Sequence, residues 1–414
     1  MWIESVKPAC LELAVAGRGL RAQPNKNERR IRMPYITKRQ VSTPKQVNIF
    51  DVLDNLDDTE IHDKKITKAG TVTRFVENIP EEMLSKFDYN SMIETLKQFN
   101  EVHKNLFDKK RESLYREFKI PKKSGGLRTI DAPNDELKEA LRELKSILEN
   151  KFGALYHTAA YAYVRERCTV DAVKRHQANQ SKWFLKTDFS NFFGSTTLEF
   201  TMRMLSKIFP FSEVMKIPGG KEALEKAISL GFLNGGLPQG TPLSPTLTNI
   251  VMIPIDHKLA QYFSGRHMVY TRYADDILVS CQVNFMFTDV VKYINDTVRN
   301  EFGAPYFIKP QKTRYGSSAG RNWNLGVMLN QDNEITIGHA KKKQFKAMIH
   351  NYICDYKKGI QWDLNDVQTL QGLMSYYIMI EKSYITHIII EANKKHNVNL
   401  GRIMKADLGG RHSA

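Results

Sequence analysis

The sequence predicts an α+β fold that combines a small antiparallel sheet with a larger set of helices. Residues 115–133 and 268–281 each show two apolar-rich runs joined by a polar turn, the pattern of a hairpin. Residues 181–195 are typical of a buried strand that ends in a turn, and the chain beyond residue 338 has helical periodicity. With 414 residues the chain is too long for one small core, so we expect two or three packed units.

The composition favours a polyanionic partner. The net charge is +16, and the commonest polyanions that a basic protein meets are nucleic acids and anionic membranes. No apolar run approaches the roughly 18 residues of a membrane span, so we expect no membrane. We also see no secretory signal. Four scattered cysteines without metal-ligand spacing argue against structural zinc and fit a cytoplasmic protein: Cys10, Cys168, Cys281 and Cys354.

The N-terminal segment is basic. Residues 1–50 hold ten Lys or Arg and three acidic residues, with little periodicity. This pattern is typical of an arm that contacts phosphates and, equally, of a plain flexible tail. Met33 could also be an internal start. Residues 51–63 then hold six acidic and no Lys or Arg residues, which indicates a solvated connector.

The hairpin at 115–133 has a basic tip, Lys-Lys-Ser-Gly-Gly, and a helix is expected directly after it. Asn134 is a suitable N-cap, and Asp135 and Glu136 follow where the helix dipole favours negative charge. An apolar stripe then recurs at helical spacing, and Gly153 is a natural stop. The stripe consists of Leu137, Leu141, Leu144 and Leu148.

The middle of the chain contains a loop rich in glycine and proline, residues 231–245, that leads into a helix. Ser244 is expected to cap this helix, with Pro245 in its first turn. Pro254 predicts a kink or break further along. After the strand pair at 268–281 we expect a helix near residues 287–302.

Three carboxylates stand out at the ends of the predicted strands. Asp188 ends the strand of residues 181–188, and Asp275 and Asp276 lie at the tip of the 268–281 hairpin. The hairpin pair alone is more typical of a polar turn. If the two elements pair side by side, however, all three carboxylates converge and repel one another unless cations neutralise them. Magnesium, which prefers oxygen ligands, suits such a cluster.

Six ordered motifs within residues 115–337 resemble those of reverse transcriptases. TDFSNFF, GGLPQGTPLSP and YADD are similar to motifs A, B and C, and IPKKSGGLRTIDAP is similar to the fingers motif before them. FIKPQKTRYGS and WNLGVML are similar to motifs D and E. The resemblance implies a right-hand polymerase fold, an α+β architecture. It would comprise a basic arm at 1–50, fingers at 51–180, a palm with an antiparallel sheet at 181–337, and a helical thumb with a C-terminal tail at 338–414.

The resemblance also implies an RNA-directed DNA polymerase, which is a nucleotidyltransferase. Asp188 and Asp275 would ligate metal, Asp276 would be the third catalytic carboxylate, and the carbonyl of Phe189 would face a metal. The cofactor would be two Mg²⁺ ions, with Mn²⁺ as a substitute. They would assist attack of a 3′-hydroxyl on the α-phosphate of a deoxynucleoside triphosphate.

Further residues would bind the nucleotide in this resemblance. Phe193, five residues after Asp188, would exclude a ribose 2′-hydroxyl, although it could also be plain core. The others would hold phosphates, the base pair or the leaving pyrophosphate: Lys122, Lys123, Arg128, Gln239, Gly240 and Lys312. A surface charge is the ordinary alternative for Arg128 and Lys312.

Within the family, the chain is similar to bacterial retron and defence-associated enzymes. The stretch WNLGVMLNQDNEITIG lacks the Val-Thr-Gly element usual in retrons and is closer to the "unknown group" of antiphage enzymes. A short chain of this kind resembles the type 2 defence systems, which copy a structured non-coding RNA into DNA. Phosphate contacts to that RNA are expected from the basic arm and from a thumb cluster, Lys341, Lys342, Lys343 and Lys346.

Other functions remain open at this point. A retron enzyme that makes RNA-linked DNA, or a template-independent DNA synthase, would carry the same motifs. An RNA-directed RNA polymerase is disfavoured by Phe193 and by YADD. A non-catalytic RNA-binding protein is the alternative of a different class, but it would not need all three carboxylates. The sequence gives no prediction of oligomeric state.

Overall fold

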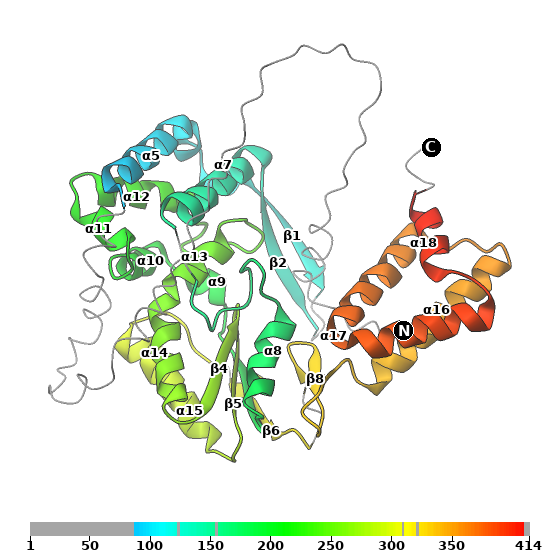
Figure 1. Cartoon of the computed structure of the whole chain (residues 1–414). Coiled ribbons are helices and arrows are strands. Elements are labelled where there is room, and N and C mark those ends of the chain that lie inside the picture. Colours follow the sequence, from blue (N-terminus) through cyan, green and yellow to red (C-terminus); the bar gives the residue numbers. More distant parts are fainter. Residues whose placement is uncertain (1–86, 122–124, 154–155, 309, 320–322, 410–414) are drawn as a thin grey trace, which may run out of the picture.

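The computed structural model describes residues 87–121, 125–153, 156–308, 310–319 and 323–409 (Figure 1). The basic arm at 1–50, the acidic connector at 51–63, and Lys122 and Lys123 at the hairpin tip lie outside these residues. The proposed boundaries between arm, fingers, palm and thumb stay predictions. Within the described ranges, no helix is both long and apolar enough to cross a bilayer.

The hairpin expected at 115–133 is confirmed. Strand β1 (Tyr115–Pro121) pairs antiparallel with β2 (Leu127–Pro133), and Ile120 lies opposite Arg128. Figure 1 shows this two-stranded ribbon reaching away from the helix that follows it toward the C-terminal helices. Most residues of the two strands are exposed, because only the base of the ribbon contacts the core.

A set of helices precedes and follows this hairpin. It consists of α5 (Tyr89–Val102), α6 (Lys104–Asp108), a 3₁₀ turn (Arg111–Leu114) and α7 (Asp135–Ser146), which continues as a π turn (Ile147–Lys151). As predicted, Asn134 caps α7, and its side chain accepts a hydrogen bond from the Leu137 amide at 2.9 Å. The stripe of four leucines predicted for this helix is fully buried.

A four-stranded antiparallel sheet forms the centre of the molecule, in the order β4-β5-β3-β6. Its strands are β3 (Trp183–Asp188), β4 (Met268–Tyr273), β5 (Asp276–Cys281) and β6 (Arg314–Ser317). The first three were predicted from the sequence. The fourth was not, because residues 314–317 form too short a run to show a period of two.

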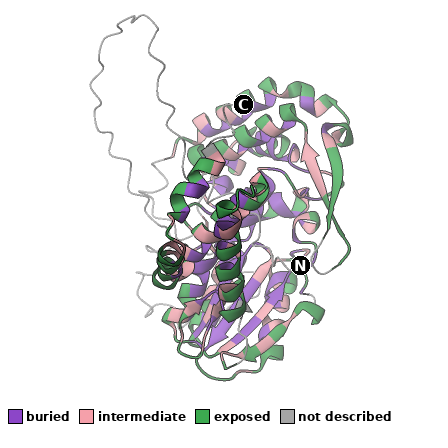
Figure 2. Ribbon diagram, turned by 90° about the vertical axis from the view of Figure 1, so that its right-hand side faces the viewer, coloured by how far each residue is buried: buried purple, intermediate pink, exposed green. Residues whose placement is uncertain are grey.

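The two faces of this sheet pack against different helices. On one face, Tyr270 and Arg272 bond to Asp256 of α14 (Ile253–Ser264). Thr271 lies on the opposite face because side chains alternate along a strand, and there it meets His176 of α8 (Thr169–Ala178). Figure 2 shows the buried residues concentrated in the sheet and in the inner sides of its helices.

The remaining helices pack beside the sheet. They are α9 (Phe192–Ser195), α10 (Leu198–Leu205), α11 (Phe211–Lys216), α12 (Gly220–Ser229), α13 (Ser244–Val251) and α15 (Phe287–Asn295), which runs on as a π turn (Asp296–Glu301). The break predicted by Pro254 occurs at Met252, between α13 and α14.

One capping prediction was wrong. Ser244 is the first residue of α13 rather than its cap, and its hydroxyl donates to the carbonyl of Pro238 at 2.8 Å. The hydroxyl oxygen of Thr241 instead accepts from the Ser244 amide at 3.2 Å. The hydroxyl that satisfies the start of the helix therefore lies three residues earlier.

The C-terminal part is helical, as predicted, and has a core of its own. A small sheet of β7 (Trp323–Asn324), β8 (Val327–Leu329) and β9 (Ile335–Thr336) leads into α16 (His339–Lys357), α17 (Leu364–His396) and α18 (Leu400–Gly409). Helix α17 is kinked at Glu381, whose φ of −134° is not helical. The core between α16 and α17 includes Phe345, Ile349, Ile385 and Ile388. The chain thus has at least two packed units (Figure 1).

Candidate active site

The register of the central sheet brings the predicted carboxylates together. Asp188, the last residue of β3, lies directly opposite Asp276, the first residue of β5. Asp275 occupies the turn between β4 and β5, and its carbonyl accepts a hydrogen bond from the Phe189 amide at 3.0 Å. All three aspartates are therefore at one end of the β3–β5 pair, although they come from segments almost ninety residues apart.

A cavity of about 320 Å³ opens at this end of the sheet. It lies on the α8 side, because Lys186, Asp188, Asp276 and Leu278 alternate onto that face. Asp275 is not among its lining residues. They are Lys186, Thr187, Asp188, Asp276, Ile277, Leu278, Lys312, Arg314, Asn324 and Leu325.

The donor atoms of this cavity fit a hard divalent cation. Asp188 is 5% exposed, and its Oδ1 has no hydrogen-bond partner among the described residues. A buried carboxylate oxygen without a partner is costly, and a second carboxylate directly opposite increases that cost. Carboxylate oxygens are the ligands that Mg²⁺ prefers, so Asp188 with the hairpin aspartates could hold it.

Three basic side chains balance part of this negative charge. The Nζ of Lys312 bonds to Oδ2 of Asp188, and Lys312 remains 57% exposed. Lys186 and Arg314 also line the cavity. Burial lowers the pKa of Lys186 to about 8, so its ammonium is still charged at neutral pH. Sequence reasoning missed Lys186, because a single lysine in an apolar strand gives no local signal.

Asn324 is a second residue that the sequence did not single out. It is 1% exposed and lines the cavity, and neither polar atom of its amide has a hydrogen-bond partner within the described part of the chain. Buried amides are normally satisfied, so this side chain is suited to a polar group that enters the cavity. Its place inside the motif WNLG was the only available signal.

A buried ion pair supports the carboxylate turn from the other face of the sheet. Arg272 and Asp256 are both fully buried, and their closest N–O distance is 2.7 Å. The same guanidinium donates to the Ala274 carbonyl at 3.1 Å, directly before Asp275. Ala274 has a φ of 57°, which is uncommon for a residue other than glycine. Arg272 thus helps to hold the strained turn that presents the aspartates.

Comparison with known proteins decides the family. A sequence model described as reverse transcriptase (RNA-dependent DNA polymerase) matches residues 120–351, more than half of the chain. The chain belongs to the reverse transcriptase family. It is therefore an RNA-directed DNA polymerase with the right-hand fold that the motifs implied, and the sheet that carries the aspartates is its palm.

Several curated relatives are bacterial retron reverse transcriptases. Retron Ec83 and retron Ec73 reverse transcriptases of Escherichia coli are 28% and 29% identical to the chain over 280 and 286 residues. These matches cover 66% and 67% of the chain and 85% of each relative. A solved telomerase from Candida albicans, in complex with a fragment of telomeric RNA, is 12% identical with a TM-score of 0.41, over 72% of this chain and 61% of that one.

Phe193 of the reverse transcriptase packs among aromatic residues and against the glycine-rich loop. It is half-buried in α9, and its ring makes edge contacts with Phe192 and Tyr163 at centroid distances of 5.6 Å and 6.4 Å. Its carbonyl accepts from the Leu237 amide at 3.1 Å, which ties α9 to the glycine-rich loop. A Cβ on Gly236 would lie 2.1 Å from the Gly194 carbonyl oxygen, so only glycine fits this contact. Tyr163 was not foreseen.

The glycine-rich loop also joins the palm to the hairpin of the fingers. The Gln239 carbonyl accepts a hydrogen bond from the Asp131 amide of β2 at 2.9 Å. Gly240 has a φ of 117°, and a Cβ there would lie 2.8 Å from the Ile130 side chain. Arg128 is exposed further along β2. The structure thus places Gln239, Gly240 and Arg128 on one connected surface.

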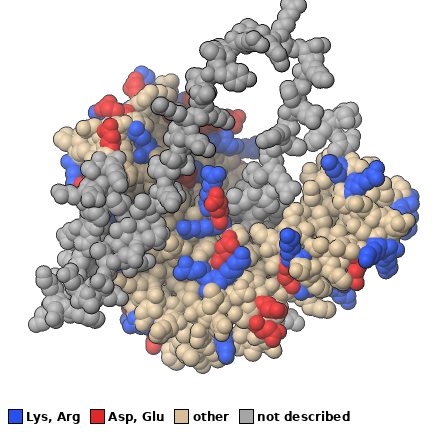
Figure 3. Space-filling model, viewed as in Figure 1, with Lys and Arg blue, Asp and Glu red and all other residues tan. Residues whose placement is uncertain are grey.

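The four thumb lysines of the sequence prediction have different surroundings. Lys342 is mostly buried and donates to Glu381 at 2.6 Å, and Lys341 donates to the Gly326 carbonyl at 3.1 Å. Lys343 and Lys346 are exposed on α16. Figure 3 shows more Lys and Arg than Asp and Glu on this face of the thumb. Lys343 and Lys346 are thus the exposed pair of the four, and the Nζ of Lys346 lies 4.0 Å from a carboxylate oxygen of Glu391.

Proposed function

We propose that this reverse transcriptase copies a structured non-coding RNA, held by the protein itself, into DNA as part of antiphage defence. The observation that carries the catalytic part is the facing pair Asp188 and Asp276. One oxygen of Asp188 has no hydrogen-bond partner in the described part of the chain, and the other charged residues of the cavity are basic. The net charge of +16 and the exposed lysines of α16 support a bound RNA. The resemblance to type 2 defence enzymes supports the biological role.

In the proposed mechanism, two divalent cations would be held by Asp188, Asp275 and Asp276, with the Phe189 carbonyl. Bound Mg²⁺, or Mn²⁺ in its place, supplies stabilisation of the charge that develops on the phosphate oxygens. Lys312 keeps its ammonium at the rim of the cavity while it pairs with Asp188, so it can give a proton to the leaving pyrophosphate. Arg128, with Lys122 and Lys123, grips the triphosphate.

The remaining residues select and orient the nucleotide. The ring of Phe193 crowds a 2′-hydroxyl and offers it no hydrogen bond, so deoxynucleotides are preferred. Gln239 and Gly240 border the new base pair, where the backbone of the loop is fixed by its bond to β2. Because the loop is held in place, a correct base pair fits beside it and a mismatched base pair of different shape does not.

The direct test uses the purified enzyme with the nucleic acid that co-purifies with it. We expect incorporation of labelled deoxynucleotides that stops when the RNA is digested beforehand. The product should be complementary to that RNA. Synthesis that continues after complete digestion would instead show a template-independent enzyme, and a product covalently joined to RNA would favour a retron mode.

A double variant separates chemistry from binding. Asp275→Ala with Asp276→Ala should abolish incorporation and leave RNA binding unchanged, since neither side chain belongs to the proposed RNA surface. Synthesis retained by this variant would refute the mechanism. The defence role is tested separately, by comparing phage plating on cells that carry the wild-type or the double-variant enzyme with its adjacent RNA.

A further inference from the structure

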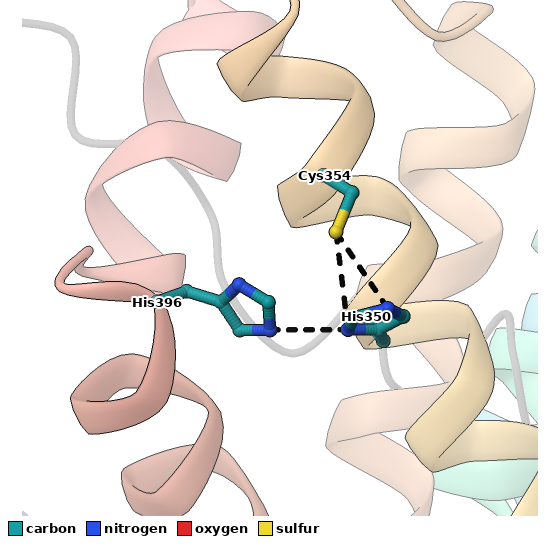
Figure 4. Close-up of side chains that lie close together, drawn as sticks. All are labelled: His350, Cys354 and His396. Atoms are coloured by element: carbon teal, nitrogen blue, oxygen red, sulfur yellow. Dashed lines mark hydrogen bonds between the residues drawn. The ribbon is translucent and has the colours of Figure 1, made fainter.

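Three side chains able to ligate a metal meet in the thumb, far from the palm carboxylates. His350 and Cys354 belong to α16, and His396 is the last residue of α17 (Figure 4). Nδ1 of His350 lies 3.0 Å from Nε2 of His396, and Sγ of Cys354 lies 3.9 Å from Nδ1 of His350. One ligand atom from each residue lies within 4.8 Å of the other two.

The fold itself positions these three residues. His350 and Cys354 are four residues apart, so they share one face of α16. The core between the two helices fixes how α17 lies against that face, and the rings of Phe345 and Tyr377 pack edge to face at 5.2 Å. Asn397 then turns the chain away with a φ of 47°, which leaves His396 at the helix end.

The distances match what a tetrahedral metal ion requires. Ligand atoms around zinc lie about 3.3 Å apart for two nitrogens and about 3.6 Å apart for nitrogen and sulfur. The observed 3.0 Å and 3.9 Å differ from these values by only a few tenths of an ångström. Without a metal, the same side chains are connected by hydrogen bonds, between the two imidazoles and between His350 and the thiol of Cys354 (Figure 4).

We propose that His350, Cys354 and His396 form a transition-metal site, suited to zinc(II), that joins α16 to the end of α17. Two imidazoles and a thiolate suit zinc and not magnesium, which takes oxygen ligands. The fourth position faces solvent, because His350 is exposed and the other two ligands are half-buried. Water or an anion completes the site there.

The site differs in chemistry from the palm cavity, so the two can be told apart. The palm offers carboxylate oxygens and takes a catalytic cation, whereas the thumb site holds a softer ion between two helices. Its effect is on the stability of the thumb. Because a metal that binds only the folded chain stabilises it, zinc should raise the midpoint of thermal unfolding.

The test uses full-length enzyme without an affinity tag, stripped of metal, reduced and titrated with cobalt(II). We expect one cobalt per chain with a thiolate-to-cobalt charge-transfer band and visible bands of tetrahedral intensity, both displaced by zinc. Zinc should raise the Tm of the wild-type chain by ~2 °C or more. Cobalt in the palm cannot give the charge-transfer band, since no cysteine lines that cavity.

Matched variants assign the ligands. Cys354→Ser and His396→Gln should remove the charge-transfer band and the zinc-induced rise in Tm, while circular dichroism shows a folded chain. Cys168→Ser and His387→Gln change a cysteine and an α17 histidine outside the cluster, and they should keep both signals. A band that survives Cys354→Ser, or a wild-type chain with no band and no zinc effect, would overturn the proposal and leave only the hydrogen bonds among these side chains.

Discussion

Asp188 and Asp276 face each other across the antiparallel pair of β3 and β5, and one oxygen of Asp188 is buried with no hydrogen-bond partner among the residues that the structure describes. This arrangement places two like charges side by side in a partly closed cavity. Without a cation this repulsion lowers the stability of the folded chain, and the bond from Lys312 to one oxygen of Asp188 offsets part of it. Catalysis and the stability of the folded chain should therefore depend on the same bound cation.

Asp188→Asn should reduce DNA synthesis by ~1,000-fold or more, because it removes a ligand of an ion that contributes several kcal/mol to the transition state. The same change should remove the stabilisation by magnesium. In the wild type, Mg²⁺ at 100 times its dissociation constant should add ~2.7 kcal/mol to the free energy of unfolding. Urea unfolding with EDTA or with Mg²⁺ measures this gain, and the exposed Asp289→Asn is the control. An equal gain in Asp188→Asn would contradict the assignment.

Phe193→Val should raise ribonucleotide incorporation relative to deoxynucleotide incorporation by ~10- to 200-fold, since one steric group in a pocket discriminates by about that much. Single-nucleotide extension with each nucleotide type gives the ratio. Phe192→Leu is the matched control, because Phe192 packs beside Phe193 but is buried in the core. If both variants change sugar selection equally, Phe193 acts through packing and is not the gate.

Arg272→Met should lower the free energy of unfolding by ~3–5 kcal/mol, because it leaves the fully buried carboxylate of Asp256 without its charge partner. The double change Arg272→Met with Asp256→Leu should cost less than Arg272→Met alone. Denaturant unfolding of the two variants decides this. Both variants should also lose activity, since the Ala274 carbonyl before Asp275 loses its donor. A double variant less stable than the single one would show that the pair is strongly stabilising.

Stability should fall as the pH is lowered from about 6.5 toward 5, because of two buried histidines. Burial lowers the pKa of His176 from its usual 6.5 to about 3, and that of His157 to about 4. At a pH between each lowered pKa and 6.5, the unfolded chain binds more protons than the folded chain. Acid therefore favours unfolding. Above pH 6.5 these histidines are neutral in both states and no longer change the stability. Each histidine contributes a slope of about 1.4 kcal/mol per pH unit.

Urea unfolding at several pH values tests this slope. His176→Gln should reduce it by about half, because His157 still titrates. His387→Gln is the control, because His387 is largely exposed on α17. A slope unchanged in His176→Gln would mean that other groups produce the acid sensitivity.

Lys343→Glu with Lys346→Glu should weaken binding of the cognate RNA and reduce the slope of log affinity against log salt by roughly two. Lys342→Glu should act differently, because Lys342 is bound to the mostly buried Glu381 at the kink of α17. Its main effect should be a lower thumb stability. Filter binding across a salt series and thermal unfolding separate the two effects. RNA binding unaffected by the exposed pair would place the RNA elsewhere.

Much of the fold could be predicted because it depends on local patterns. The helix after Asn134, the strand that ends at Asp188 and the C-terminal helices have periodicities that burial of one face imposes. Strand β6 and the cap of α13 were missed, since a four-residue strand and a hydroxyl three residues away leave little local signal. The family could also be recognised from the sequence, because its motifs are short and follow one another in a fixed order along the chain.

The sequence by itself predicted which carboxylates, aromatic residue and loop would carry the chemistry of this reverse transcriptase. Only the tertiary structure decided how these residues lie relative to one another. It set the register that faces Asp188 with Asp276, brought Lys312 to Asp188 across 124 residues, and gathered His350, Cys354 and His396 from two helices. Contacts of this kind depend on how whole elements pack, and no local periodicity encodes the distance between side chains on different elements.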